Sequence, residues 1–295
     1  MRNRISIMIA AFALVLAGSM SAVVSAQSAA PKQLPSNVRE ERLASRLMGR
    51  DMPYRVVLPA GYDPDGGKKK LYPVIYLLHG LGGSYANWTD KTGLADYVRD
   101  HGIIVVTPEG GNGWYTDSVS TPTDRFESYI ISELIPEVEK RFAVDPERRG
   151  RIIAGLSMGG YGAMKFGLKY PEKFSLVGSF SGALGVASFT EKNAGTIGKG
   201  VDSILGGEDS EVRKANDIFA LLRAMPADKV AGLPFIYQSC GTEDFLFENN
   251  RRFLDLLTEK KVKREYREHP GLHDWTFWDS QIREFLALAE RRPAK

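Results

Sequence analysis

The sequence predicts one α/β domain, with a mainly parallel central β-sheet that is flanked by helices. Two observations support this prediction. Short apolar runs rich in β-branched residues recur along the 295-residue chain, and segments with apolar residues at helical spacing lie between them. This alternation is typical of parallel strands joined by helical crossovers. The runs are continuously apolar, as expected of strands that are buried on both faces.

The expected elements follow in chain order. Seven strands are predicted at residues 54–58, 74–78, 103–107, 151–156, 176–181, 235–240 and 262–267. Apolar residues at helical spacing, among them Ile130, Leu134 and Val138, predict a helix over 126–142. Further helices are expected over 161–170, around 253–257 and over 278–289. Residues 182–232 break the alternation and are rich in glycine, which indicates an insertion over the functional site.

A basic and then apolar segment begins the chain. Arg2 and Arg4 precede an apolar run over residues 5–17, and small residues stand just before Gln27. This is the pattern of a secretory signal peptide, so residues 1–26 are predicted to be removed and the protein to be exported to the periplasm or the extracellular space. Residues 27–45 are expected to form a flexible leader and residues 46–295 a single domain.

Composition narrows the function classes. The N-terminal apolar run is too short for a permanent span and no later stretch approaches about 18 apolar residues, so no stable membrane insertion is expected. The only cysteine, Cys240, cannot form an internal disulfide. Loss of Arg2 and Arg4 lowers the net charge from +3 to +1 (3 − 2), which gives no basis for nucleic-acid binding. The four histidines, at 79, 101, 269 and 273, lack metal-site spacing, and no metal or cofactor is expected.

The strongest chemical signal is the pentapeptide Gly-Leu-Ser-Met-Gly at residues 155–159. It has the form G-x-S-x-G and stands between a predicted strand and a predicted helix, which is the context of a nucleophile elbow. A serine at the apex of such a turn has a strained backbone, and Gly155, Gly159 and Gly160 keep the turn free of bulky side chains. Ser157 is therefore the predicted nucleophile.

A serine hydroxyl needs a base within hydrogen-bond reach, and two histidines follow Ser157. His273 lies beyond Gly271 in a loop that leads into the last helix, and it is the favoured base. His269 ends a predicted strand and is interpreted as a strand-end residue.

The base in turn needs an orienting carboxylate. The predicted strand at 235–240 is followed by Glu243 and Asp244 in one loop, and either could reach the imidazole. Asp274, next to His273, is interpreted as the N-cap of the last helix.

The reaction also needs donors for a developing oxyanion. The backbone N–H of Met158, at the start of a helix, is one candidate. The other is the N–H of Leu81, in a glycine-rich loop that follows the buried run 74–78. His79 stands before this loop and is interpreted as structural.

Several segments in order resemble a family of esterases that includes S-formylglutathione hydrolases, feruloyl and other carbohydrate esterases, and mycolyltransferases. They are YRVVLPAGY (54–62), LLHGLGG (77–83), GWYTD (113–117), ESYIISELIP (127–136), GLSMGG (155–160), GTED (241–244) and GLHDWTFW (271–278). The resemblance covers nearly all of the expected domain. It implies an α/β-hydrolase fold with Ser157, Asp244 and His273 as the catalytic triad, and it favours Asp244 over Glu243. It also implies Leu81 and Met158 as the oxyanion donors.

The expected function is that of an exported serine esterase acting on small acyl, acetyl-sugar or hydroxycinnamoyl (feruloyl-type) esters. The partner is then a small-molecule or carbohydrate-linked ester. Alternatives are an acyltransferase of the mycolyltransferase type, an S-formylglutathione hydrolase, whose cytosolic members carry no export signal, and a non-catalytic binding module. Trp114 and Tyr115 are candidates for the substrate pocket, with packing as the equal alternative.

Overall fold

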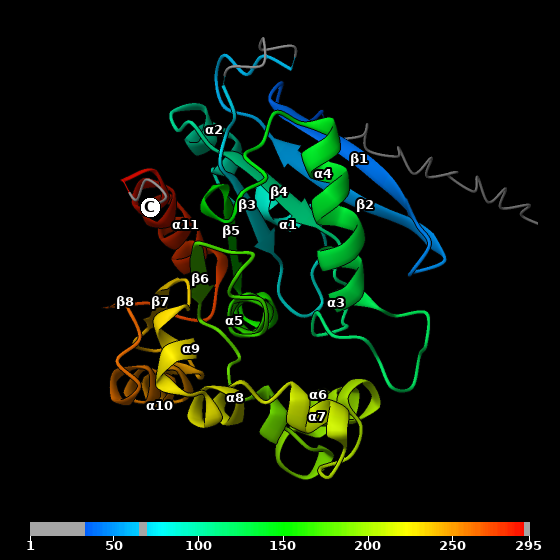
Figure 1. The fold of residues 1–295 in the computed structure, drawn as a ribbon, viewed down its shortest axis with the longest axis vertical. Coiled ribbons are helices and arrows are strands. Elements are labelled where there is room, and N and C mark those ends of the chain that lie inside the picture. The colour runs from blue at the N-terminus through cyan, green and yellow to red at the C-terminus, as the bar shows by residue number, and fades with distance from the viewer. Residues whose placement is uncertain (1–32, 65–69, 292–295) are drawn as a thin grey trace, which may run out of the picture. The chain divides into compact units, whose positions relative to one another are not determined.

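An eight-stranded sheet forms the centre of the computed structural model, which describes residues 33–64 and 70–291 (Figure 1). The predicted signal peptide lies outside these residues. The strand order is β1-β2-β4-β3-β5-β6-β7-β8. The strands are β1 (Val38–Ser45), β2 (Arg50–Val57), β3 (Val74–Leu78), β4 (Ile104–Pro108), β5 (Arg151–Leu156), β6 (Leu176–Phe180), β7 (Phe235–Gly241) and β8 (Arg264–His269). β1 and β2 run antiparallel to their neighbours, and the other six strands are parallel.

All seven predicted strands are present, and the predicted α/β class is confirmed. β3 and β5 have the predicted bounds. β8 begins two residues later than expected. Val262 is buried, and its N–H donates to Leu257 O at 2.9 Å to close the preceding helix, so it is not part of the strand.

The leader prediction is wrong for residues 38–45, because they form β1. This strand pairs with β2 along its whole length, from Val38 opposite Val57 to Ser45 opposite Arg50. Only the two end residues are buried. The middle of the strand carries charged residues on an exposed edge, so its sequence lacks the apolar run by which the other strands are recognised.

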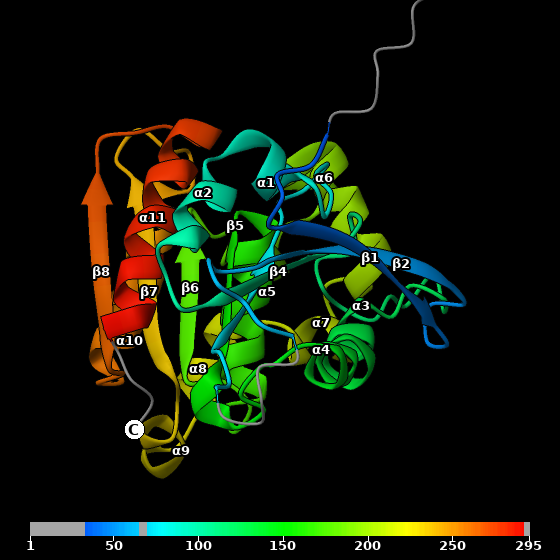
Figure 2. The same cartoon turned by 90° about the horizontal axis from the view of Figure 1, so that it is seen from above.

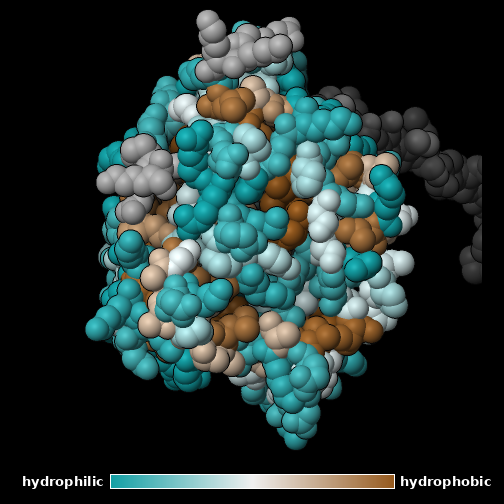
Figure 3. All heavy atoms as spheres, in the orientation of Figure 1, coloured by the Kyte–Doolittle hydropathy of each residue, from teal (hydrophilic) through white to brown (hydrophobic). Residues whose placement is uncertain are grey.

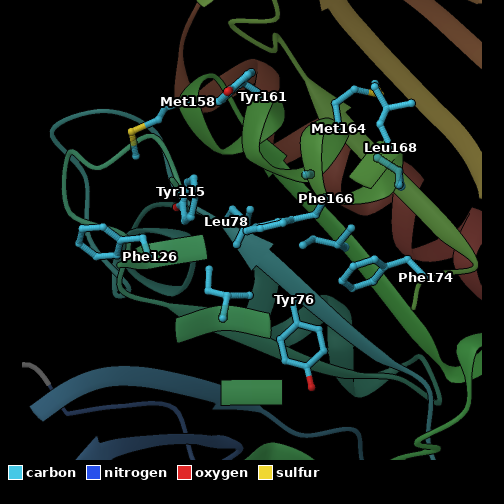
Figure 4. Close-up of a cluster of buried hydrophobic side chains, with 14 of the residues drawn as sticks. Tyr76, Leu78, Tyr115, Phe126, Met158, Tyr161, Met164, Phe166, Leu168 and Phe174 are labelled. Carbon is cyan, nitrogen blue, oxygen red and sulfur yellow. The ribbon is translucent and has the colours of Figure 1, made fainter. Parts of the chain in front are cut away.

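Helices cover the sheet on both faces (Figure 2). Side chains alternate along β3, so Ile75 and Leu77 pack on one face with α1 (Asn87–Lys91), α2 (Leu94–Arg99) and α11 (Trp275–Arg291). Tyr76 and Leu78 pack on the other face, which α3 (Phe126–Tyr129), α4 (Ile135–Arg141), α5 (Met158–Lys169), α8 (Ile218–Ala224) and α10 (Phe247–Glu259) cover. Figure 4 shows part of this second core, with Phe166 of α5 close to Leu78.

The helix expected over 126–142 is interrupted in its middle. A π-helical turn, η1 (Ile130–Leu134), separates α3 from α4. Pro136 lies in the first turn of α4 and has no N–H to donate to the preceding turn. The wider turn accommodates this missing bond without ending the helix.

The predicted insertion is helical and lies between β6 and β7. It contains η3 (Val186–Ser188), α6 (Glu191–Leu205), α7 (Glu211–Ala215), α8 and α9 (Ala227–Ala231). α6 is kinked at Gly195, which has a φ of 53°. Arg213 holds the insertion together: it is 3% exposed and donates to four backbone carbonyls, of Ala187, Phe189, Gly206 and Gly207, and to Asp202.

Both edges of the sheet are charged. β1 has the sequence VREERLAS and β8 the sequence REYREH. On β8, Arg267 forms ion pairs with Glu265 and with Glu284 of α11, both at 2.5 Å. Hydrophilic residues also dominate the face drawn in Figure 3, with smaller apolar patches among them. In the part of the chain that the structure describes, no helix is both long and apolar enough for a membrane span.

Candidate active site

The loops that follow β3, β4, β5, β7 and β8 all lie at the carboxyl-terminal ends of the parallel strands. Ligands of open α/β sheets bind at these strand ends. Ser157 follows β5, Asp244 follows β7 and His273 follows β8. The topology therefore brings together residues that are up to 116 positions apart in the sequence.

Ser157 stands at the sharp turn between β5 and α5, with φ 52° and ψ −117°. A non-glycine residue with positive φ is strained. The backbone around this turn is packed so closely that no side chain would fit at Gly155 or Gly159, so both positions need glycine. A Cβ on Gly159 would lie 2.5 Å from Leu78 O and 2.6 Å from His79 O, and one on Gly155 would lie 2.6 Å from the backbone of Gly159.

Ser157, His273 and Asp244 form a continuous hydrogen-bonded chain. Ser157 Oγ is 3.0 Å from His273 Nε2, and His273 Nδ1 is 2.8 Å from Asp244 Oδ2. The Asp244 side chain is fully buried, whereas that of His273 is 17% exposed. The carboxylate is thus shielded from solvent, whereas part of the imidazole is accessible.

Asp244 is held as a carboxylate. Its burial would raise the pKa, but hydrogen bonds from His273 and from the N–H of Leu246 (2.8 Å to Oδ1) outweigh burial and lower the pKa below the usual range. An ionised carboxylate only accepts, so His273 carries its proton on Nδ1. Nε2 is then free to accept the Ser157 hydroxyl proton.

The neighbouring candidates lie elsewhere. The exposed Glu243 accepts the N–H of Gly271 at 2.5 Å. His269 ends β8, as predicted, with Nε2 3.7 Å from Glu284. Asp274 accepts the N–H of Phe277 at 3.0 Å in the first turn of α11, which confirms its interpretation as a cap.

The N–H groups of Leu81 and Met158 donate to no protein acceptor within the described residues. Met158 is the first residue of α5, where N–H groups have no partner within the helix. Gly80 approaches the serine closely, since a Cβ on it would lie 3.4 Å from Ser157 Cβ. The two N–H groups are therefore available beside Ser157.

His79 supports the Leu81 loop from behind, as predicted. It is 1% exposed. Its Nε2 accepts the N–H of Gly110 at 2.9 Å, so its proton is on Nδ1, which donates to Gly80 O at 2.8 Å. On the other side of the loop, Asn112 accepts the N–H of Gly82 at 2.8 Å. The residues after β4 thus fix the residues after β3.

Trp114 and Tyr115, expected as possible pocket residues, pack in the core instead. They are 3% and 0% exposed, and neither is among the residues that line the hollow beside Ser157. Both have positive φ, 51° and 52°. This conformation turns the Tyr115 ring toward the protein interior (Figure 4), where its hydroxyl donates to His79 O at 2.9 Å. The aromatic pair therefore supports the site and does not line this hollow.

A buried ion pair anchors the Tyr115 segment to α5. Lys165 is completely buried, and its ammonium donates to Tyr115 O at 2.6 Å, Thr116 Oγ1 at 2.7 Å and Glu127 Oε2 at 2.7 Å. Burial lowers the pKa of Lys165 to about 8 although Glu127 opposes the shift. Burial would raise the pKa of Glu127, but Lys165 and Lys169 hold it at about 2.

A hollow of about 310 Å³ opens beside Ser157. The Gly80–Gly83 loop and the start of α11 form its walls. It is lined by Gly80, Leu81, Gly82, Gly83, Asn87, Lys91, Leu156, Ser157, His273, Asp274, Trp275 and Trp278. It gives a small molecule access to the serine from one side.

The supporting residues Asn112 and Lys165 were not singled out by sequence reasoning. The run Gly110, Gly111, Asn112, Gly113 follows β4 at the same edge as the other loops, so its position could have indicated a role. Lys165 lies between the apolar residues Met164 and Phe166 in the middle of α5, and a charge at such a position is a signal of a buried pair.

The chain is similar to known esterases in sequence and in fold. A family model described as "Putative esterase" matches residues 45–288. An acetyl esterase of Caldicellulosiruptor saccharolyticus is 31% identical over 213 residues, which cover 70% of this chain and 79% of the relative. The S-formylglutathione hydrolase of Mus musculus is 28% identical over 80% of this chain and 87% of its own. The structure of a ferulic acid esterase superposes with a TM-score of 0.74 at 27% identity, covering 86% and 98% of the two chains.

Proposed function

Since the chain belongs to the esterase family whose model matches residues 45–288, we propose that it is a serine carboxylic-ester hydrolase with Ser157, His273 and Asp244 as its catalytic triad. The observation that carries the assignment is the hydrogen-bonded chain from Ser157 Oγ through the imidazole to Asp244, at 3.0 and 2.8 Å. The fold alone would not support this assignment, because proteins with the same fold catalyse many different reactions.

In the acylation step, Ser157 Oγ attacks the ester carbonyl carbon while His273 Nε2 takes the hydroxyl proton. The imidazolium that forms is stabilised by the buried Asp244 carboxylate. The carbonyl oxygen becomes an oxyanion, and the N–H groups of Leu81 and Met158 donate to it. The tetrahedral intermediate then collapses: the bond to the alcohol oxygen breaks, and His273 returns its proton to that oxygen.

Deacylation repeats these steps with water as the nucleophile. His273 takes a proton from water, and the hydroxide adds to the acyl carbon. The second tetrahedral intermediate collapses when the bond from the acyl carbon to Ser157 Oγ breaks; His273 returns its proton to Oγ, and the carboxylic acid leaves. An alcohol acceptor in place of water would make the protein an acyltransferase. Product analysis with and without a sugar acceptor separates the two outcomes.

The proposed substrates are small acyl, acetyl-sugar or hydroxycinnamoyl esters. The names of the acetyl esterase and the ferulic acid esterase to which the chain is similar support these classes. The test is a panel of p-nitrophenyl acetate, acetylated xylose and methyl ferulate with the purified enzyme. Hydrolysis of none of them would contradict the proposal. We further propose export, for which the N-terminal residues 1–26 are the support; N-terminal sequencing of the protein from the culture medium or periplasm tests it.

A second candidate is thioester hydrolysis of the S-formylglutathione type. It is favoured by the 28% identity to the mouse S-formylglutathione hydrolase across 80% of this chain. The same triad serves both substrates, since thioesters and esters form the same acyl-enzyme. A comparison of kcat/KM for S-formylglutathione and for the ester panel decides between them.

The base can be tested against its neighbour in sequence. Replacing His273 by Ala is expected to lower kcat by roughly 10⁴-fold or more, because within residues 33–64 and 70–291 His273 is the base that lies within hydrogen-bond distance of Ser157 Oγ. Replacing His269 by Ala is expected to retain most of the activity, because its side chain only approaches Glu284. Steady-state kinetics of both variants on one ester make the comparison, and the reverse ranking would move the base to His269.

The acid can be tested in the same way. The change Asp244→Asn is expected to lower kcat/KM by about 10²- to 10⁴-fold with folding intact, because an amide can favour the wrong imidazole tautomer and cannot offset the imidazolium charge. The matched change Glu243→Gln is expected to cost far less, since the amide oxygen can still accept from Gly271. Kinetics and thermal melting of both variants check this. A crippled Glu243→Gln beside a parent-like Asp244→Asn would show that the acid is wrongly assigned.

A further inference from the structure

Large exposed apolar side chains are few in the described residues, and two of them flank His273. Phe245 is 77% exposed and Leu272 is 57% exposed. Phe245 directly follows Asp244, and Leu272 directly precedes His273. We call these two side chains the apolar rim. Exposed apolar side chains that gather at one place, unlike those scattered singly over a surface, mark a surface that a ligand or partner covers.

The rim is held in place and is not a loose loop tip. The N–H groups of Leu246 and Phe247 donate to Asp244 at 2.8 and 2.9 Å, which fixes the backbone on the far side of Phe245. The two loops are also joined to each other, because Gly271 N–H donates to the Glu243 side chain and Glu243 N–H donates to Gly271 O at 3.1 Å.

The Phe245 ring lies against the imidazole itself. The two ring centroids are 4.6 Å apart, while Trp278 contacts the imidazole at 4.9 Å with its ring nearly perpendicular. Trp278 is buried and is among the residues that line the hollow beside Ser157. Phe245 and Leu272 are not among those lining residues, so the apolar rim lies outside the hollow; the Phe245 ring contacts the imidazole there and leaves most of its own surface exposed.

The mechanism proposed for the triad determines which part of the substrate lies next to His273. The leaving alcohol oxygen must receive its proton from His273 Nε2, so the alcohol portion departs along the imidazole. The carbonyl oxygen points instead to the N–H groups of Leu81 and Met158. Side chains that flank His273 therefore contact the alcohol portion of the ester.

We propose that the apolar rim, Phe245 and Leu272, binds an apolar, preferably aromatic, group in the alcohol portion of the substrate. The proposal rests on the hydrolase function above and adds a substrate class to it. An aromatic group stacked on Phe245 gains both burial and ring contact, which are strongest for offset or edge-to-face pairs. Such substrates combine a small acyl group with a benzyl-type or alkyl alcohol.

Two matched pairs of esters test the rim. Methyl acetate and benzyl acetate differ only in the alcohol, and methyl acetate and methyl phenylacetate differ only in the acyl group. The parent enzyme is expected to prefer benzyl acetate to methyl acetate, and Phe245→Ala to reduce that kcat/KM ratio by roughly 10-fold. Leu272→Ala is expected to lower the same kcat/KM ratio. Phe245→Tyr, which keeps the aromatic ring, is expected to keep the ratio of the parent enzyme.

The control is Leu71→Ala, which removes a 54% exposed apolar side chain from a position outside the functional site; it is expected to leave both ratios unchanged. An equal loss on methyl and benzyl acetate in Phe245→Ala would show that the ring only orients His273 and would overturn the proposal. A drop in the acyl-pair ratio with no change in the alcohol-pair ratio would also overturn it. If the parent hydrolyses none of these esters, the hydrolase assignment itself is overturned. The two results described above would overturn only the role of the apolar rim and would still support the hydrolase assignment.

Discussion

Replacing Ser157 by Ala is expected to abolish covalent labelling by a fluorophosphonate probe and to lower kcat by roughly 10⁴-fold or more. The reason is that only Oγ of Ser157 lies within hydrogen-bond distance of His273 Nε2 among the described hydroxyl groups. Without it, the enzyme retains the contribution of the oxyanion donors and of binding, which leaves a small residual rate above that of water.

Ser120→Ala is the matched control, because Ser120 is exposed and bonds only to other surface hydroxyls. It is expected to keep parent labelling and activity. Mass spectrometry of the labelled parent is expected to place the probe on Ser157. A probe attached to another serine, or full labelling of Ser157→Ala, would contradict the nucleophile assignment.

Replacing Glu127 by Gln is expected to give the largest loss of stability, roughly 3 to 5 kcal/mol. The change leaves the buried Lys165 ammonium without its carboxylate, and it also removes the partner of Lys169 at 2.6 Å. Urea unfolding at pH 7 measures the effect. Glu137→Gln is the control, since its ion pair with Arg141 is long, at 3.7 Å, and partly exposed to solvent; its expected change is within about 0.5 kcal/mol.

The pH dependence of this effect has a definite sign. The pKa of Glu127 is lowered from 4.5 to about 2 in the folded protein. Its carboxylate therefore stabilises the fold fully above pH 4.5, and this contribution is lost as the pH falls from 4.5 toward 2. The difference in unfolding free energy between the parent and Glu127→Gln is expected to narrow between pH 5 and pH 3. A difference that stays constant over this range would mean that Glu127 titrates normally.

The sequence predicted those parts of the fold that depend on local signals. Buried parallel strands are continuous apolar runs, so β3 and β5 were located with their bounds. β1 was missed because an edge strand needs no apolar run, and the π turn in the 126–142 helix was missed because its cause, Pro136, acts through a hydrogen bond that is absent. The spacing of apolar residues, from which the helix was predicted, does not show that one backbone hydrogen bond is missing.

For the site, sequence order and spacing indicated Ser157 and His273, but two adjacent carboxylates left the acid open. Geometry separates them: Asp244 is 2.8 Å from the imidazole, and Glu243 bonds to Gly271 instead. The inward packing of Tyr115 could not be predicted, because it depends on a positive φ and on Lys165, which lies 50 residues away. Contacts between distant residues are set by tertiary structure, which one sequence does not display.

The charged edges of the sheet have a consequence for how molecules meet in solution. An open sheet edge presents unpaired N–H and C=O groups that can recruit a strand from another copy, the first step of edge-to-edge aggregation. β1, with Arg39, Glu40, Glu41 and Arg42 in succession, and β8, with its arginines and glutamates, would each have to bury charge to accept such a strand. The charged residues at both edges of the sheet therefore oppose pairing with a strand from another copy.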